Sequence, residues 1–245
     1  MRQGDVLRFK MDGVLVKDAF LVGAAFKALV RAVEKIAEWP ETPGKHMVYR
    51  KHHRVENFYP YHVGIRAILD GPVCKAVSEL FGEPAVLFKD KLNLKPPGGK
   101  GFTAHQDQRT YTEYGGHFIA AAIAIDECTQ ENGCLEVAYS RHLEGLFGPT
   151  WDTLPNEADF DFEPIGLNPG DVLFLDSYTP HRSKPNNSDK PRRVLYATFN
   201  PISDGDWRER HFSDKRMAYP PDIEREPGKT YLTGAERRGY RGMQT

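Results

Sequence analysis

Residues 169–199 read PGDVLFLDSYTPHRSKPNNSDKPRRVLYATF and contain two apolar runs, Asp171–Leu175 and Arg193–Phe199. Short runs rich in Val, Leu, Tyr and Phe, bounded by Gly, Pro and Asn, are typical of β-strands. A Pro-Asn-Asn sequence at 185–187 lies between the two runs and favours a chain reversal. The stretch therefore predicts two neighbouring strands that are joined by a turn-rich loop.

The same texture continues outward from this stretch, but only as far back as Pro84. Three more short runs predict strands at Val86–Leu94, Phe118–Ile125 and Leu135–Ala138. Before Pro84 the pattern predicts one strand and two helices, at Gly13–Val16, 20–39 and 62–81, the last broken near Gly71-Pro72. Helices followed by many short strands predict an α+β chain whose core is mainly β, built as a sandwich or barrel.

The length of 245 residues, with 40% hydrophobic residues, is ample for one buried core. We therefore expect a single domain over 1–245. Its parts are a helical N-terminal part at about 1–84, a β core at about 85–201 and a C-terminal extension at 202–245. The extension is polar and contains Pro220-Pro221, which predicts a solvated, partly irregular segment.

Composition excludes several classes of protein. A net charge of −1 disfavours a nucleic-acid partner, which requires a clustered basic excess. No run of 18 apolar residues exists, which argues against a transmembrane helix and a membrane partner. The N-terminal residues carry no apolar signal segment, and the three cysteines form no Cys-x-x-Cys pair, so we expect a cytoplasmic protein with reduced thiols. The oligomeric state stays open.

The sharpest local feature is Thr103-Ala104-His105-Gln106-Asp107. Residues i and i+2 of a strand share a face, so His105 and Asp107 are expected to point the same way. His181 follows the apolar run that ends at Leu175, at the place where a scaffold presents ligands to a cavity. Two His and one carboxylate make the facial triad of non-haem Fe(II) oxygenases, which leaves positions open on the iron.

Arg192 follows His181 by eleven residues and begins the last strand candidate. On that strand it shares a face with Val194, Tyr196 and Thr198. A guanidinium at the inner end of a strand can hold the far carboxylate of a dicarboxylate with two parallel hydrogen bonds. The combination of the triad and this arginine predicts a metal site with a neighbouring dicarboxylate clamp.

With these motifs the sequence resembles the phytanoyl-CoA dioxygenase-like branch of the Fe(II)/2-oxoglutarate oxygenases, from Gly13 to about Pro201. The stretches that carry the resemblance are HQD at 105–107, ENGCL at 131–135, PGDVLF at 169–174 and HRS at 181–183 leading to Arg192. The resemblance implies a double-stranded β-helix (jelly-roll, cupin-like) with flanking N-terminal helices. It also implies hydroxylation of an unactivated C–H bond with Fe(II), 2-oxoglutarate and O₂, releasing succinate and CO₂.

The resemblance assigns roles to individual residues as well. It implies iron ligands at His105, Asp107 and His181, and a 2-oxoglutarate pocket formed by Arg192, Ser183, Asn93 and Gln106. One departure concerns the strand before the ENGCL stretch, where members often carry a Trp and this chain has Ala122. The smaller side chain predicts a wider pocket there.

A small anionic or zwitterionic metabolite is the expected substrate. Lys89, Lys91, Asn93 and Lys95 share a strand face, which predicts a cationic wall. The expected substrate residues are Arg109, Lys91, Lys89 and Tyr111. The tail at 214–228 is similar to that of members that hydroxylate organophosphonates, which implies a substrate such as 2-aminoethylphosphonate.

Other functions stay open at this point. The same oxygenase chemistry can act on an amino acid or a secondary-metabolite intermediate. A metal-dependent hydrolase or isomerase can use a His/Asp/His site, although it needs no dicarboxylate clamp. A jelly-roll that binds a small molecule without turnover is the third class.

Overall fold

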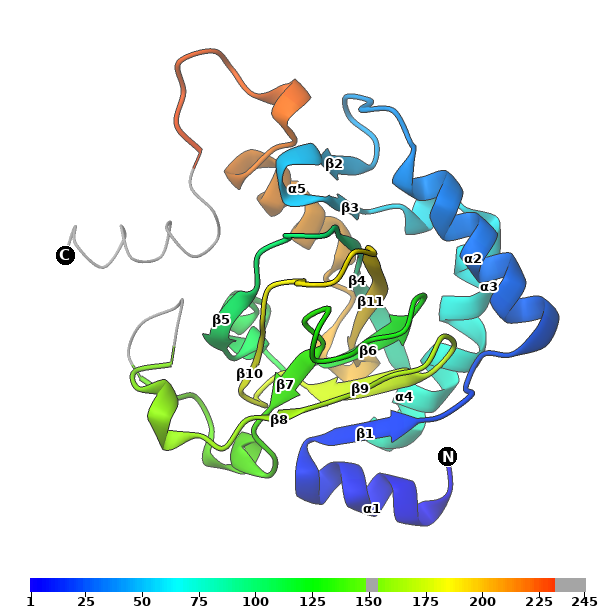
Figure 1. Cartoon of the computed structure of the whole chain (residues 1–245), viewed down its shortest axis with the longest axis vertical. Coiled ribbons are helices and arrows are strands. Elements are labelled where there is room, and N and C mark those ends of the chain that lie inside the picture. The colour runs from blue at the N-terminus through cyan, green and yellow to red at the C-terminus, as the bar shows by residue number, and fades with distance from the viewer. Residues whose placement is uncertain (149–153, 232–245) are drawn as a thin grey trace.

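The computed structural model describes residues 1–148 and 154–231. Two antiparallel sheets form its centre (Figure 1). The large sheet has the strand order β1 (Val14–Lys17), β9 (Val172–Asp176), β6 (Ile119–Ala124), β11 (Arg192–Pro201), β4 (Ala85–Lys95), β3 (Arg54–Glu56) and β2 (Met47–Tyr49). The small sheet has the order β5 (Phe102–His105), β10 (His181–Ser183), β7 (Leu135–Val137) and β8 (Glu163–Pro164).

The large sheet buries both of its faces. Alternate residues of its central strands, such as Ala122, Leu173 and Val194, pack in one apolar cluster with Val137 of the small sheet and Ile165. The residues between them, including Ile123, Phe174 and Leu195, pack in a second cluster with the helices. Period-2 alternation thus divides each strand between the inner face that carries the site and the outer face that carries the helices.

Five α-helices are present in the described residues: α1 (Gln3–Asp12), α2 (Gly23–Ala37), α3 (Val63–Ile68), α4 (Cys74–Phe81) and α5 (Arg208–Ala218). Figure 1 shows α2, α3 and α4 together on one side of the large sheet. A π-helical turn at Leu69–Val73, which contains Pro72, separates α3 from α4. This turn confirms the predicted break, because the proline ring lacks the N–H that an α-helix needs.

The jelly-roll fold with N-terminal helices is confirmed, but the helical and β parts do not divide at residue 84. β1, β2 and β3 all come from the part expected to be helical, and β3 and β2 complete one edge of the large sheet. The prediction missed β2 and β3 because strands of three residues are too short to show a period.

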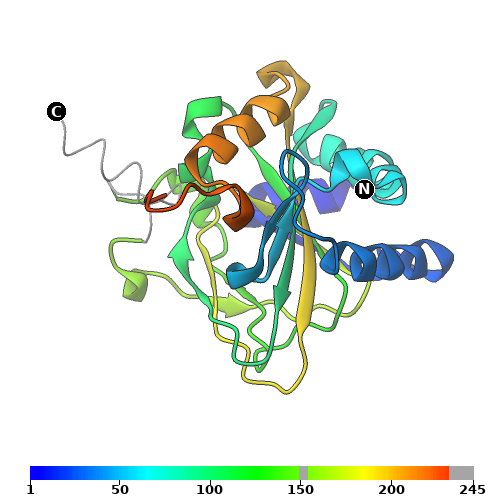
Figure 2. The ribbon, with the colours of Figure 1, turned by 90° about the horizontal axis from the view of Figure 1, so that it is seen from above.

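The C-terminal extension is more ordered than expected, as far as it is described. α5 follows β11 and buries Phe212 with Met47 and Tyr49 of β2. In Figure 2 α5 is the orange helix beside the β2–β3 hairpin. Residues 232–245 of the predicted extension lie outside the described part. Within the described residues, the structure contains no helix with both the length and the apolar character needed to cross a membrane.

Candidate active site

His105 and His181 meet because their strands pair in register. His105 ends β5, His181 begins β10, and the two residues are direct cross-strand partners. Their ring centroids lie 4.3 Å apart. Asp107 is not on the strand as expected, since β5 ends at His105 and a 3₁₀ helix begins at Asp107. The turn nevertheless brings the three side chains together, with their ligand atoms all within 4.8 Å of one another.

Backbone carbonyls orient both imidazoles. The Nδ1 atom of His105 lies 2.7 Å from the carbonyl oxygen of Thr103, and that of His181 lies 2.9 Å from the carbonyl oxygen of Thr179. A hydrogen bond at Nδ1 leaves the lone pair on Nε2, which is how ligating histidines are usually held. Two Nε2 atoms and one carboxylate therefore form a donor set that fits iron and leaves coordination positions free.

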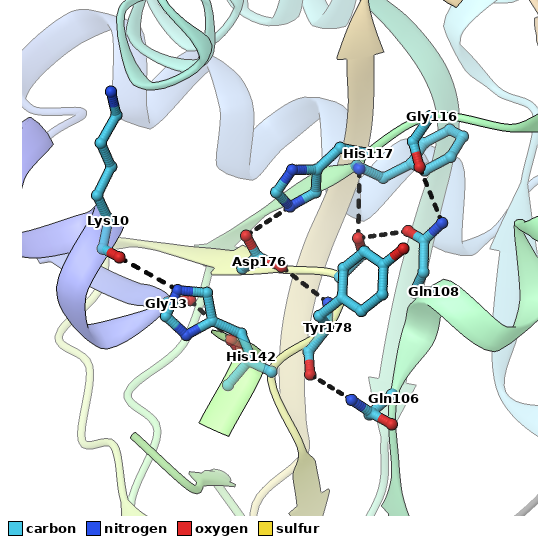
Figure 3. Close-up of polar contacts among 12 residues, drawn as sticks. Lys10, Gly13, Gln106, Gln108, Gly116, His117, His142, Asp176 and Tyr178 are labelled. Carbon is cyan, nitrogen blue, oxygen red and sulfur yellow. Dashed lines mark hydrogen bonds and ion pairs between the residues drawn. The ribbon is translucent and has the colours of Figure 1, made fainter. Parts of the chain in front are cut away.

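Side chains of His117 and Gln108 hold the turn before His181 (Figure 3). The carboxylate of Asp176 lies 2.6 Å from Nε2 of His117 and accepts a 2.8 Å hydrogen bond from the backbone N–H of Tyr178. The Ser177 hydroxyl donates to the side chain of Gln108 at 2.7 Å. This network fixes the approach to the third ligand, as expected of a preorganised site.

Charge and burial set the protonation of the ligands. Burial lowers the pKa of His105 to about 4, so its imidazole is neutral and available to a metal at pH 7. Burial alone would raise the pKa of Asp107, but Lys89 and then His181 outweigh it and hold the pKa below its ordinary value. The donor set thus includes a neutral imidazole at His105 and a carboxylate anion at Asp107.

Arg192 lies at the other end of the inner face. It is 4% exposed, and its Nη1 atom lies 3.9 Å from the sulfur of Cys128. Its Nε has no hydrogen-bond partner among the described residues. Lys95 is its cross-strand partner on β4 and donates to the Ser183 hydroxyl at 3.3 Å. A buried guanidinium with an unused donor, beside a lysine and a serine, fits the distal carboxylate of 2-oxoglutarate.

Asn93 and Gln106, the other expected cosubstrate residues, differ in their placement. Asn93 lies on β4 opposite Val194, on the inner face of the sheet. Gln106 is 2% exposed, and its amide donates to the carbonyl oxygens of Gly145 and Tyr178 and accepts from the N–H of Phe147. The expected cosubstrate role of Gln106 does not agree with this structure, because backbone groups occupy its side chain.

The expected substrate residues gather next to Asp107. Lys89 Nζ lies 4.5 Å from the ring centre of Tyr111, and Lys91 Nζ lies 4.8 Å from that of Tyr196. Burial and then Lys89 lower the pKa of Lys91 to about 7. Burial and then Asp107 raise the pKa of Tyr111 to about 12. Arg109 donates from Nη2 to the carbonyl oxygen of Phe147 at 2.8 Å, so its guanidinium supports that loop.

Four further charged or polar residues beside this wall are not identified by the sequence analysis. Glu56 on β3 is the cross-strand partner of Lys91, and its carboxylate pairs with Arg54 at 2.8 Å and with Lys215 of α5. His211 is the fourth, one helical turn before Lys215. β3 lies between β4 and β2, and its three residues are too few for the sequence to indicate that Glu56 faces Lys91.

Ala122 lies directly opposite Tyr196 in the β6–β11 pair. Both residues belong to the apolar cluster between the sheets, with Ala122 at its centre and Tyr196 packed against it. Burial alone would lower the pKa of Arg192, but its interactions with Tyr196 and then Cys128 outweigh burial and raise that pKa. The small residue therefore lies next to an aromatic ring that reaches from the arginine to Lys91.

The comparisons with known proteins agree with this site. The family model for phytanoyl-CoA dioxygenase (PhyH) matches residues 9–194. The chain is 38% identical to a 2-aminoethylphosphonate dioxygenase of an uncultured bacterium, HF130_AEPn_1, over 91% of each chain. It is also 38% identical to the methylphosphonate hydroxylase of Gimesia maris, over 86% of this chain and 85% of that one.

Solved structures show the same fold. The epimerase SnoN in complex with Fe³⁺ and alpha ketoglutarate superposes with a TM-score of 0.72 at 17% identity, covering 96% of each chain. EctD from S. alaskensis with bound Fe superposes with a TM-score of 0.71 at 18% identity, covering 83% of this chain and 78% of that one.

This chain belongs to the phytanoyl-CoA dioxygenase (PhyH) family. It is an iron- and 2-oxoglutarate-dependent dioxygenase that acts on a small molecule. The expected family, fold class, reaction class and cofactors are therefore confirmed, and the hydrolase and binding-protein alternatives are set aside.

Proposed function

We propose that the enzyme hydroxylates a C–H bond of a small organophosphonate, with 2-aminoethylphosphonate as the first candidate. The observation that carries this proposal is a group of four half-buried cations, Lys89, Lys91, Arg54 and Lys215. Lys89 and Lys91 interact with Asp107, while Arg54 and Lys215 pair with Glu56, the cross-strand partner of Lys91. Two relatives of 38% identity are named for phosphonate hydroxylation. A cation-rich wall next to the metal ligands suits a substrate whose head group carries two negative charges.

In this proposal His105, Asp107 and His181 hold the iron, and Arg192 with Ser183 binds the distal carboxylate of 2-oxoglutarate. The support is the donor set within 4.8 Å and the buried guanidinium with its unused Nε. Asn93 lies between Lys91 and Lys95 on β4 and lines the cosubstrate pocket in this proposal. Iron with 2-oxoglutarate supplies the oxidising power from O₂, yielding succinate and CO₂.

The residues of the chain orient the substrate and keep water out. Lys89 and Lys91 bind the phosphonate oxygens, while the rings of Tyr111 and Tyr196 cover the two ammonium groups on their other side. Glu56 pairs with both Arg54 and Lys215, and its negative charge offsets one of the four positive charges of this group. The carbon next to the phosphorus then lies toward the metal ligands.

We also assign the reaction to one domain spanning 1–245 and place the enzyme in the cytoplasm. The three cysteines are free, which agrees with a reducing compartment. The assignment to one domain is supported by β2 and β3, which come from the N-terminal part and pair with the β core.

The test is turnover of 2-aminoethylphosphonate and methylphosphonate with Fe(II), 2-oxoglutarate and O₂, followed by ³¹P NMR. A new phosphorus resonance in proportion to succinate supports the proposal, with Lys89→Met expected to lose most of that product. Amino acids tested under the same conditions provide the comparison class. Hydroxylation of an amino acid with no reaction of either phosphonate would disprove the substrate assignment while leaving the oxygenase chemistry intact.

A further inference from the structure

α5 contacts β3, β4 and the segment that follows Asp107. Its Lys215 pairs with Glu56 of β3, and its Arg208 pairs with Asp90 of β4. Its Asp214 accepts a 3.2 Å hydrogen bond from the hydroxyl of Tyr114, which lies in the 3₁₀ turns that follow the metal ligand Asp107. The helix therefore bridges the sheet edge and the segment that carries a metal ligand.

One face of α5 carries two polar side chains, His211 and Lys215. His211 and Lys215 are separated by four residues, so they lie on the same helical face. The His211 ring lies against Phe88, with 4.4 Å between centroids, and against Tyr114 at 5.7 Å. Its Nε2 is buried and has no hydrogen-bond partner among the residues that the structure describes. A buried polar nitrogen without a partner is costly unless a ligand completes it.

Charge interactions place the same face near the wall. Lys215 and His211 both interact electrostatically with Lys89 and with Glu56. Burial lowers the pKa of Lys215 to about 8, even though Glu56 opposes that shift. The ammonium of a lysine has three donors, and within the described part of the chain Lys215 donates to Glu56, so donors remain for an anion.

The chain shares α5 with a relative that is named for a phosphonate. The family model ends at residue 194, before α5 begins at Arg208. The match to the 2-aminoethylphosphonate dioxygenase spans 91% of this chain, which is a larger share than residues 1–218 make up, so it runs past α5. The helix is therefore part of the region shared with this relative, and the superposition with SnoN, which covers 96% of this chain, extends past it as well.

We infer that α5 is a substrate-binding element, in which Lys215 and Nε2 of His211 contact the same phosphonate group as Lys89 and Lys91. The inference rests on the proposed function and extends it, because it assigns substrate binding to a helix that follows the last strand of the β core. The head group is then held between the β4 lysines and the α5 face. α5 closes the side of the pocket next to β3.

The test is calorimetric titration of methylphosphonate and of 2-aminoethylphosphonate into anaerobic enzyme that carries Fe(II) and 2-oxoglutarate. Lys215→Met is expected to weaken binding of both probes about tenfold or more, and His211→Phe, which keeps the ring packing, about threefold. Lys215→Arg, which keeps the charge, should stay within about threefold of wild type. Arg210→Met is the matched control, since it removes a charge from the same helix at a side chain that is 53% exposed.

The affinity for 2-oxoglutarate, measured in the same variants, separates a binding role from a structural one. Unchanged 2-oxoglutarate affinity with weakened probe binding supports the inference. Equal weakening of both in Lys215→Met, or unchanged probe binding, overturns it. If the wild-type enzyme binds neither probe, the proposed function itself fails. If the wild-type enzyme binds the probes and Lys215→Met binds them equally well, only the inference about α5 fails.

Discussion

Replacement of Arg192 by methionine should separate cosubstrate affinity from folding. The guanidinium is 4% exposed, its Nη1 lies 3.9 Å from the Cys128 sulfur, and its Nε lacks a partner among the described residues. Burial of this charge opposes its interactions with Tyr196 and Cys128, so the guanidinium makes only a small net contribution to folding without ligands. We therefore expect the Arg192→Met free energy of unfolding, without ligands, to be unchanged or higher by about 1 kcal/mol.

The loss in 2-oxoglutarate binding follows from the donors that are removed. A charged hydrogen bond contributes roughly 1.5–3 kcal/mol, and a guanidinium can give two to one carboxylate. Lys95 donates to Ser183 next to Arg192, and its pKa is lowered to about 8 by burial and then by Arg192, so it retains a positive charge for part of the population. Allowing for that lysine, we expect a loss of about 3 kcal/mol, which is about 150-fold in Kd.

The assay is anaerobic titration of the iron-loaded protein with 2-oxoglutarate, following the weak visible charge-transfer band. Arg193→Met is the matched control, because Arg193 is the next residue on β11 and pairs with Asp126 at 2.7 Å, away from the inner face. It should bind 2-oxoglutarate like wild type. A change below about threefold in Arg192→Met, or an equal loss in both variants, would refute the cosubstrate role of Arg192.

Three further changes test other parts of the site. Asp107→Ala should weaken iron binding at least about 100-fold, measured by chelator competition without oxygen, and near-normal affinity would contradict the ligand assignment. Gln106→Leu removes three partly buried hydrogen bonds to backbone groups and should lower the free energy of unfolding by about 3 kcal/mol in urea denaturation, whereas an effect on 2-oxoglutarate affinity alone would restore its cosubstrate role. Burial lowers the pKa of His117, but Asp176 outweighs it and raises that pKa above 6.5, so this pair stabilises the fold fully below about pH 6.5 and less as pH rises through the raised pKa. Because the His117 side chain is 47% exposed, the pair contributes less than about 1 kcal/mol to the free energy of unfolding. The urea midpoint should differ between about pH 6 and about pH 9, and His117→Gln should remove the part of that difference that this pair causes. If the difference is the same in the variant, another group causes it.

The sequence predicted the parts of the fold that have strong local periodicity. β4, β6, β9 and β11 appear close to their expected bounds, because each is a run of alternating or continuous apolar residues. Asp107 was expected on a strand, yet the strand ends two residues earlier and a 3₁₀ turn carries the carboxylate. The expected proximity of His105 and Asp107 is still observed, because a tight turn also directs the Asp107 side chain toward His105.

The parts that could not be predicted depend on contacts far apart in the sequence. Glu56 carries no local sign that it pairs with Lys215, which lies 159 residues later. α5 has little segregation of apolar residues, so its one buried residue, Phe212, gives no helical pattern. Gln106 lies beside two expected ligands and looks like a pocket residue, but alternation turns it toward the backbone of Gly145.

In the proposed function, one strand, β4, serves two anionic molecules. Its inner face carries Lys95 opposite Arg192, and Lys91 opposite Tyr196, in the register of the β4–β11 pair. Four residues along a strand span about 13 Å, so the two lysines are far enough apart to serve separate ligands. Lys95 belongs to the 2-oxoglutarate end, while Lys91 interacts with Asp107 at the metal end. Removal of the Lys91 charge should therefore leave the affinity for 2-oxoglutarate nearly unchanged. If Lys91→Met lost 2-oxoglutarate binding as strongly as Arg192→Met, both anions would share one site.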